Sequence, residues 1–342
     1  MKPAKMVKFA PRSIQPLAVL LLVTVAAGQS PSRPVARVRP AISSLAFSPD
    51  GTRLALGRYR EVELIDPMTG RVAATLRGLE NQVRGLAFSR DGRWLVAVGG
   101  NPGQFGEVRL YDVAKGSEVR AWRGHRDHIT AVAFAPDGKV VATASYDRTI
   151  RLWSPESGAE LRTLRDHTDA VFALAFSADG RFLATASADR TVKIWDPATG
   201  RRLTTLSDAL DAVNAIAFGG EGRMLAGAGA DRTIHLWQLN ENGEGRRIRS
   251  LIAHEDAIVA LALAPDGKTL ATGAADRSLR IWNAGTLVET HGGEPQSDWV
   301  QALAFSPDGQ WIAAGRFDGS FSLYNVVNGR KRRMAFIDKD PR

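Results

Sequence analysis

The sequence predicts an all-β fold, a seven-bladed β-propeller of four-stranded antiparallel blades. Three observations lead to this prediction. Apolar residues alternate with a period near two in short runs, which is typical of strands and excludes helical repeats. A unit of 41 to 46 residues recurs seven times along the 342 residues. Each unit holds four such runs, and a repeat of this length with four strands is typical of propeller blades.

Residues 167–195 contain the clearest copy of the unit. Three runs rich in β-branched, aromatic and small apolar residues, AVFALAF, RFLATAS and TVKIW, are separated by turn residues. The segments ADG and ADR predict two hairpin turns, and DPATG predicts a third before the fourth run, RRLTTL. The unit therefore predicts one four-stranded sheet.

Each copy carries an apolar residue at one equivalent position and an acidic–Gly pair about three residues later. The apolar residues are Phe47, Phe88, Phe134, Phe176, Phe218, Leu263 and Phe305, and the pairs begin at Asp50, Asp91, Asp137, Asp179, Glu221, Asp266 and Asp308. They place blades 1 to 7 at residues 41–81, 82–127, 128–169, 170–211, 212–256, 257–298 and 299–337, followed by a C-terminal tail at 338–342. Such units cannot bury their sheets alone, so they are expected to stack into a closed ring.

The outer strand of blade 7 can come from either side of the ring. Residues 332–337 can form it, and residues 35–39 can compete for the same edge. We expect the C-terminal segment to supply this strand.

Residues 1–28 lie outside the repeat and have the pattern of a secretory signal peptide. A basic stretch ends at Arg12, an apolar run covers residues 17–27, and small residues follow. The run has eleven residues, whereas a membrane span needs about 20. We therefore expect an extracytoplasmic protein, periplasmic or secreted, with an uncleaved membrane anchor or a cytosolic tail as alternatives. Residues 29–40 predict a Pro- and Arg-rich linker.

Charge and cysteine content narrow the function classes. The net charge is +9, and Lys2, Lys5, Lys8 and Arg12 supply four of these charges, so the ring itself is mildly basic. This permits acidic partners without demanding nucleic acid. Cysteine is absent, which excludes disulfides, thiolate metal sites and cysteine nucleophiles.

The copies resemble the WD repeat, and the likeness covers roughly residues 40–337. The copies that carry it best contain Gly124-His125, Ser145-Tyr146-Asp147 and Trp153, and then His167, Ser187-Ala188-Asp189 and Trp195-Asp196. The resemblance implies a closed ring of radial four-stranded sheets that usually binds other proteins.

The resemblance also implies an internal hydrogen-bonded tetrad in blades 3 and 4. Its members are His125, Ser145, Asp147 and Trp153 in blade 3, and His167, Ser187, Asp189 and Trp195 in blade 4. The aspartate orients the histidine, the histidine reaches the serine, and the serine reaches the indole N–H. A catalytic triad occurs once, whereas this set recurs, so we interpret it as structural.

Other blades lack members of the tetrad. Blade 5 has Ala209 and Gly229 at the His and Ser positions, and blade 6 has Ala274 at the Ser position. We therefore expect Asp189→Ala to destabilise the fold more than Asp276→Ala, because it leaves more polar groups unpaired.

The sequence predicts no catalytic residue, no cofactor and no metal site. His128, His235 and His291 lack ligand-like spacing. Each acidic–Gly turn offers one carboxylate, whereas a calcium loop supplies several oxygens at fixed spacing.

Alternating strand directions predict one face on which the second hairpins and the inter-blade loops emerge together. The candidate partner-binding residues of this face are Arg84, His128, Arg148, Phe172, Arg190, Arg232, Arg277, Trp299 and Arg316. Four of the arginines follow a tetrad-type aspartate, and Phe172 and Trp299 are candidate aromatic anchors. A routine turn role for the arginines and a core role for the aromatic residues are the alternatives.

Together these features predict a monomeric ring that binds a protein or peptide and performs no chemistry. Two alternatives stay open: an enzyme or small-ligand binder that uses the ring's central channel, and a binder of an anionic polymer through the arginines. Nucleic acid is not the favoured partner, and a membrane contact requires an uncleaved N-terminal segment.

Overall fold

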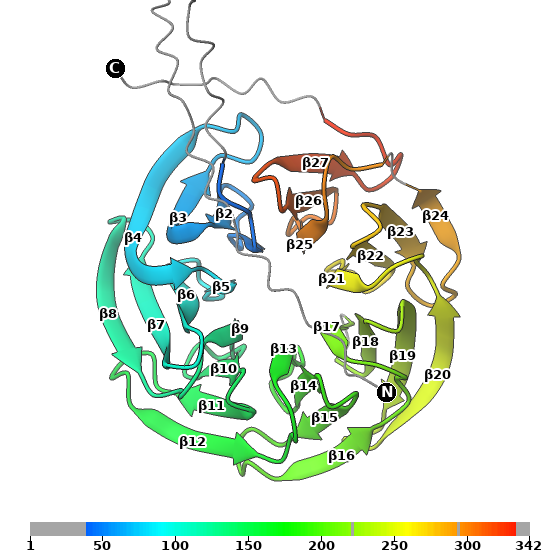
Figure 1. Ribbon diagram of the computed structural model, residues 1–342, viewed down its shortest axis with the longest axis horizontal. Helices are drawn as coiled ribbons and strands as arrows, with labels where there is room; N and C mark the ends of the chain where they lie inside the picture. The colour runs from blue at the N-terminus through cyan, green and yellow to red at the C-terminus, as the bar shows by residue number, and fades with distance from the viewer. Residues whose placement is uncertain (1–38, 220–221, 293–294, 333–342) are drawn as a thin grey trace, which may run out of the picture. The chain divides into compact units, whose positions relative to one another are not determined.

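Seven antiparallel sheets stand side by side around a common axis (Figure 1). The computed structural model describes residues 39–219, 222–292 and 295–332, so the predicted signal segment and nearly all of the predicted linker lie outside the described residues. Every regular element in the described ranges is a strand. The prediction of an all-β, seven-bladed propeller is thus confirmed. The described part of the chain contains no helix with the length and apolar character needed to cross a bilayer.

Each of the first three blades is a four-stranded sheet whose strands follow chain order. Blade 1 contains β1 (Ser44–Phe47), β2 (Leu54–Gly57), β3 (Tyr59–Ile65) and β4 (Val72–Gln82). Blade 2 contains β5 (Gly85–Phe88), β6 (Trp94–Asn101), β7 (Phe105–Asp112) and β8 (Ser117–Arg123). Blade 3 contains β9 (Ile129–Phe134), β10 (Val141–Ser145), β11 (Thr149–Trp153) and β12 (Glu160–Arg165).

The next three blades repeat this order. Blade 4 contains β13 (Val171–Phe176), β14 (Leu183–Ser187), β15 (Val192–Trp195) and β16 (Arg202–Leu206). Blade 5 contains β17 (Val213–Phe218), β18 (Met224–Gly229), β19 (Thr233–Leu239) and β20 (Gly245–Ile252). Blade 6 contains β21 (Ile258–Leu263), β22 (Thr269–Ala274), β23 (Leu279–Asn283) and β24 (Glu289–Gly292).

Blade 7 has three strands in the described residues, β25 (Val300–Phe305), β26 (Trp311–Arg316) and β27 (Phe321–Asn325). On the outer edge of β27, Tyr324 forms an antiparallel bridge with Lys331, and Arg332 N donates to Leu323 O at 2.8 Å. The C-terminal side of the chain therefore contacts this edge. Residues 333–337 of the predicted outer strand, and residues 35–38 of its competitor, lie outside the described residues.

The apolar core lies between neighbouring blades. One cluster joins Ile234 and Leu236 of blade 5 to Ile258, Leu270 and Trp282 of blade 6, and similar clusters occur at other blade boundaries. The second strands are buried on both faces, so they consist of small and branched apolar residues such as the LATAS of β14. Fully burying a leucine or isoleucine side chain contributes about 1.5–3 kcal/mol, so this stacking is the main stabilising term of the ring.

Alternating strand directions give the ring two unlike faces. The turns between second and third strands, such as residues 146–148 and 317–319, emerge on one side together with the segments that enter each inner strand. We call this side the loop face. The acidic–Gly turns and the turns to the outer strands emerge on the opposite face. There Gly138 has φ 72°, a left-handed conformation that glycine adopts at little cost.

Candidate functional site

A chain of four hydrogen-bonded side chains runs through blade 4. Trp195 Nε1 donates to Thr185 Oγ1 at 2.9 Å, and the same oxygen lies 2.8 Å from His167 Nε2. His167 Nδ1 lies 2.7 Å from Asp189 Oδ2. An indole N–H only donates and a carboxylate only accepts, so Trp195 donates to the threonine hydroxyl and Nδ1–H donates to Asp189. Both ring nitrogens of His167 therefore have hydrogen-bond partners.

Blades 3 and 6 contain the same network. Its members are His125, Thr143, Asp147 and Trp153 in blade 3, and His254, Thr272, Asp276 and Trp282 in blade 6. The three histidine side chains have no solvent exposure. The networks are therefore internal supports of the blades.

The hydroxyl of the network comes from threonine, so the predicted role of Ser145 and Ser187 is wrong. The serine lies on the same face of the strand two residues later, where the strand ends. There Ser145 Oγ donates to His128 O at 3.0 Å and accepts from Asp147 N at 3.1 Å, which closes the turn.

Blade 6 was also predicted to be incomplete, and this is wrong for the same reason. Its hydroxyl comes from Thr272, so Ala274 removes nothing from the network. The ground for expecting Asp189→Ala to be more damaging than Asp276→Ala, a missing hydroxyl in blade 6, is therefore removed.

Burial and hydrogen bonds shift the pKa of the aspartate in blade 3 and of the histidine in blade 6. Burial raises the pKa of Asp147, but hydrogen bonds from His125 and Thr149 outweigh this and hold the pKa well below its usual range. In blade 6, burial lowers the pKa of His254 by more than the neighbouring Asp276 raises it. A neutral imidazole beside an ionised carboxylate is thus the stable arrangement in blade 6.

Blade 5 rebuilds its polar centre from other residues. Gly227 stands at the threonine position, and an added Cβ there would come within 2.8 Å of Trp237 Cζ3, because the indole covers this glycine. Trp237 Nε1 donates to Asp208 Oδ2 at 2.7 Å. The imidazole comes from His235 on the adjacent strand, which lies 2.9 Å from Asp231 Oδ2 and stacks on Trp237.

Two positions of the loop face hold alanine in three successive blades and aromatic rings in two others. One is the last residue before the inner strand, and the other opens the turn after the second strand. The backbone N–H of the turn residue donates to the carbonyl oxygen of the residue before the inner strand. In blades 4, 5 and 6 this bond runs from Ala188 to Ala170, from Ala230 to Ala212 and from Ala275 to Ala257, at 2.8–2.9 Å. The same bond joins Tyr146 to His128 in blade 3 at 3.2 Å and Phe317 to Trp299 in blade 7 at 3.1 Å.

The aromatic pairs form contacts of their own. The rings of His128 and Tyr146 stack with centroids 4.5 Å apart, and those of Trp299 and Phe317 lie 6.3 Å apart. Tyr146, Trp299 and Phe317 are 46%, 49% and 56% exposed. Alanine satisfies the same backbone geometry in blades 4 to 6, so the fold does not require these rings.

Phe172 extends the aromatic surface of blade 3. The pairing of β13 with β14 shifts by one residue between Val171 and Ala173, which leaves Phe172 in a bulge. At equivalent positions Thr130 and Asn214 donate to a backbone oxygen of the next blade, at 2.5 and 2.8 Å. Phe172 cannot make this bond and instead lies 5.8 Å from Tyr146, centroid to centroid. We call His128, Tyr146 and Phe172 the blade 3 platform, and Trp299 and Phe317 the blade 7 platform.

Comparison with protein families identifies the repeat. The family described as WD domain, G-beta repeat, matches residues 70–102, 116–154, 158–196, 200–238, 245–283 and 285–325. The chain belongs to the WD-repeat family. Each match covers the outer strand of one blade and strands of the next, so successive WD repeats interlock their blades. The first three strands of blade 1 lie outside the matched segments, and a comparison with curated proteins gives no match.

Four arginines of this WD-repeat ring follow a tetrad-type aspartate, and they lie on the loop face. This agrees with the prediction made from their place in the second hairpins. Arg148, Arg190, Arg232 and Arg277 are exposed and adopt left-handed φ values of 64–70°. This conformation costs a non-glycine residue about 1–2 kcal/mol, and blade 7 has Gly319 at the same position. Within the described ranges, none of the four guanidinium groups forms an ion pair or a side-chain hydrogen bond.

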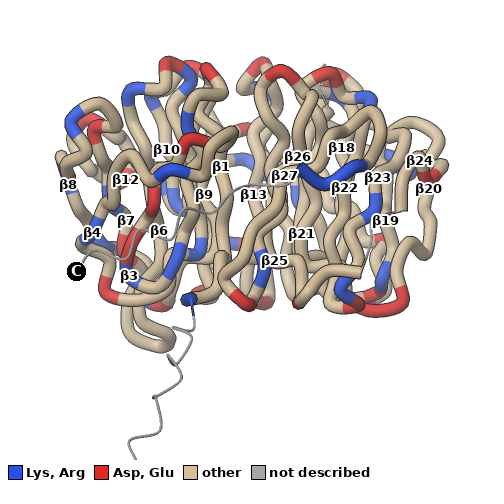
Figure 2. The backbone as a smooth tube through the Cα atoms, turned by 90° about the horizontal axis from the view of Figure 1, so that it is seen from above, with Lys and Arg blue, Asp and Glu red and all other residues tan. Residues whose placement is uncertain are grey.

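Carboxylates interrupt this arc of arginines. An aspartate precedes the first aromatic or alanine position in blades 3 to 7, and it accepts a hydrogen bond from the next backbone N–H at 2.7–2.8 Å. These residues are Asp127, Asp169, Asp211, Asp256 and Asp298. Figure 2 shows basic and acidic residues interspersed along both rims of the ring. The loop face thus carries both signs of charge in close alternation.

The structure places the remaining predicted face residues differently. Arg84 is exposed on the loop face, at the position equivalent to Phe172. Arg316 is 2% exposed and its guanidinium binds Gln296 and Tyr324 inside blade 7, so its assignment to the binding face is wrong. His128 is also buried, because Tyr146 covers its ring, and it supports the platform from below.

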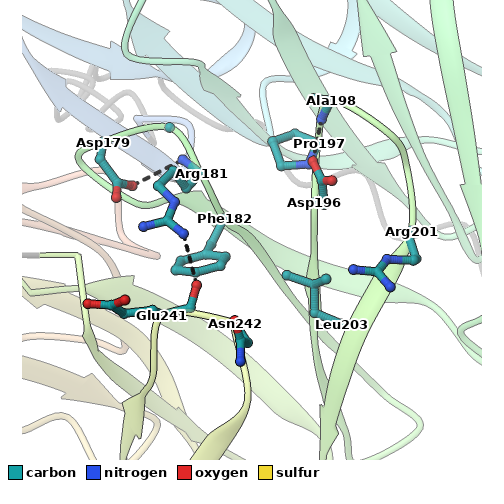
Figure 3. Close-up of a pocket in the computed structure, with 11 residues that line it drawn as sticks. Asp179, Arg181, Phe182, Asp196, Pro197, Ala198, Arg201, Leu203, Glu241 and Asn242 are labelled. Carbon is teal, nitrogen blue, oxygen red and sulfur yellow. Dashed lines mark hydrogen bonds between the residues drawn. The ribbon is translucent and has the colours of Figure 1, made fainter.

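A shallow pocket of about 530 Å³ lies on the opposite face between blades 4 and 5 (Figure 3). The lengthened outer turn of blade 5 forms one wall, where Glu241 O accepts a hydrogen bond from Arg181 at 2.9 Å. The carboxylates of Asp179 and Asp196 accept hydrogen bonds within their own turns. These acidic groups are engaged in structure, so the pocket offers no convergent set for chemistry.

Proposed function

We propose that this WD-repeat ring is a non-catalytic module that binds a protein or peptide on its loop face. One observation carries the proposal: exposed aromatic pairs occupy blades 3 and 7 at positions where the fold needs only alanine. Aromatic residues dominate the energetics of protein interfaces, and a solvent-exposed cluster of them marks an interaction site.

The proposal assigns no catalytic step to the chain. The Thr–His–Asp sets are enclosed, and they recur in three blades with the same hydrogen bonds. The part of the chain that the structure describes contains no group of three or more His, Asp or Glu residues that could hold a metal ion. A binding role uses the loop face as it stands, whereas catalysis would need groups that these residues do not bring together.

The anionic-polymer alternative receives one supporting observation, the four exposed arginines without ion pairs. The carboxylates that alternate with them oppose it, because a polyanion would meet repulsion at each blade. Binding to a polyanion through six to ten phosphate contacts weakens about 10³–10⁵-fold between 50 and 200 mM salt. A weak response to salt, together with retention of the partner by Arg190→Glu, would exclude this alternative.

Affinity capture with matched variants tests the proposal. The immobilised chain is compared with Trp299→Ala, Tyr146→Ala and Leu161→Ala, the last being an apolar residue of the outer strand with 53% exposure. We expect both platform variants to lose the same partner, with about 30-fold or more weaker binding for an interface anchor worth about 2 kcal/mol. Leu161→Ala should retain the partner. Equal retention by all three variants would contradict the proposal.

We also propose that the protein is exported and that residues 1–28 direct the export. The support is the order of basic, apolar and small residues in this segment. N-terminal sequencing of the mature protein should begin near Gly28. A soluble cytosolic product that retains Met1 would contradict export.

A further inference from the structure

The two aromatic platforms lie across the ring axis from each other. The blade 3 platform lies at the start of β9, the end of β10 and on β13, and the blade 7 platform lies at the start of β25 and the end of β26, on the other side of the ring (Figure 1). Blades 4, 5 and 6 form one arc between them, and blades 1 and 2 form the other (Figure 1). A ligand that reaches both platforms must therefore pass over one of these arcs or across the axis.

The arc of blades 4 to 6 carries small apolar residues where the platforms carry rings. Its blades carry the alanine pairs 170 and 188, 212 and 230, and 257 and 275 at the positions that hold aromatic rings in the platforms. Ala170 is buried and the other five alanines are half-buried, so short methyl groups occupy these positions in place of rings. The two aromatic platforms thus lie at the ends of a path lined by these six alanines, which we call the track.

The sides of the track are polar and carry both charges. Arg190, Arg232 and Arg277 are exposed on its blades without ion pairs in the described residues. Asp169, Asp211 and Asp256 are exposed as well, each held by the next backbone N–H. A segment with polar and oppositely charged side chains complements this alternation, whereas a polyanion or polycation does not.

The ring holds the platforms at a fixed separation. Blades 3, 4 and 6 contain the complete Thr–His–Asp–Trp network, and continuous apolar clusters join the blades of the arc. A ligand that engages two sites on a rigid frame at once binds more tightly than a ligand that engages one, because the second contact becomes intramolecular.

We propose that both platforms hold one ligand, an extended polypeptide segment that follows blades 4 to 6 and sets a bulky apolar side chain on each platform. This inference rests on the proposed binding function of the loop face. Between its two anchors the segment is polar and carries charges of both signs. The ligand class is thus a linear peptide with two apolar anchors, rather than a polyanion.

Peptide selection on the full-length chain tests this inference. A displayed library of about 20-residue random peptides, which extend to roughly 65 Å, is selected for binding, and affinities of the selected peptides are measured in solution. We expect sequences with two bulky apolar residues separated by a polar stretch. Trp299→Ala and Tyr146→Ala should each weaken binding about tenfold or more, with Leu161→Ala as the unaffected control.

A double-substitution comparison tests whether one peptide contacts both platforms or whether the platforms bind separate ligands. When the peptide residue on the blade 7 platform is replaced by alanine, Trp299→Ala should weaken binding further by less than about twofold. Affinity should also fall less than about tenfold between 50 and 200 mM salt, far below the loss for a polyanion. Phe317→Ala serves as a second variant of the same platform if Trp299→Ala folds poorly.

Three outcomes would overturn the inference. Peptides that respond to one platform only would leave the proposed function standing and refute the two-anchor ligand. Peptides that respond to neither platform, or a selection that yields no binder, would refute both. A loss of about 10³-fold or more with salt would identify a polyanion-like ligand instead.

Discussion

Blade 4 and the seam between blades 7 and 1 carry different kinds of residue at the same strand position. At the end of its second strand blade 4 carries Ser187, a short side chain that closes the local turn. Blades 1 and 7 carry Arg58 and Arg316 there, and both arginines are buried. Blade 4 continues into its neighbours through the chain, whereas blades 7 and 1 meet without a connecting loop.

The two seam arginines supply polar contacts at this boundary. Arg58 binds Glu63 at 2.7 Å within blade 1, Pro40 O at 2.8 Å and Gly319 O of blade 7 at 3.1 Å. Arg316 organises blade 7 through Gln296 and Tyr324, and its backbone oxygen accepts Ile42 N at 3.0 Å. The comparison shows that internal networks stiffen individual blades, while the buried side chain of Arg58 and the backbone of Arg316 help to close the ring.

The largest effect is expected from Arg58→Met, which removes the link to blade 7. It leaves two carbonyl oxygens and the Glu63 carboxylate without their donor, and breaking a buried pair costs about 3–5 kcal/mol. Glu63 is a quarter exposed, so we expect the lower end, about 3 kcal/mol. Urea unfolding measures the loss. Arg60→Met, at a neighbouring exposed position, is the control and should change stability by less than about 0.5 kcal/mol; equal losses for both variants would refute the role of the seam.

An intermediate effect is expected inside blade 4. Thr185→Val preserves shape but deprives Trp195 Nε1 and His167 Nε2 of their partner, which should cost about 2–4 kcal/mol. Ser187→Ala removes only turn hydrogen bonds and should cost about 1 kcal/mol. Thermal unfolding of the two variants orders them, and a larger loss for Ser187→Ala would restore serine to the network.

The smallest effect concerns pH and blade 6. The pKa of His254 is lowered in the folded state, mainly by burial, so the unfolded chain binds more protons below its ordinary pKa of about 6.5. The stability contributed by the neutral imidazole is present above that pH and falls as the pH drops from 7.5 to 5.5. One such group changes stability by at most about 1.4 kcal/mol per pH unit. His254→Gln should flatten this slope in a thermal-unfolding series, and an unchanged slope would assign it to other groups.

The repeat period was sufficient to predict the ring, because stacking of equal units depends on pattern more than on individual residues. The positions of the second-hairpin arginines followed from the same alternation of strands. The strand pattern did not show whether Thr185 or Ser187 belongs to the network. Both lie on one face of β14, and only the reach of Trp195 decides between them. Two threonines at the same place in blades 3 and 6 were the available signal.

Other features of the site depend on contacts between distant residues. Arg316 reads as a surface residue until Gln296 and Tyr324, from other parts of its repeat, are seen around it. Tyr146 and Phe317 were missed as platform residues, although aligning the copies places them opposite Ala188, Ala230 and Ala275. Comparing what each blade carries at positions where alanine suffices would have found both platforms.

Hydrogen exchange of the chain with a bound partner tests the central claim most directly. We predict simultaneous protection of the segments around Tyr146 and Phe172 and around Trp299 and Phe317, with the outer strands β8 and β12 unchanged. Protection confined to the outer strands, or to the turns of the opposite face near Asp196, would contradict a binding role for the loop face.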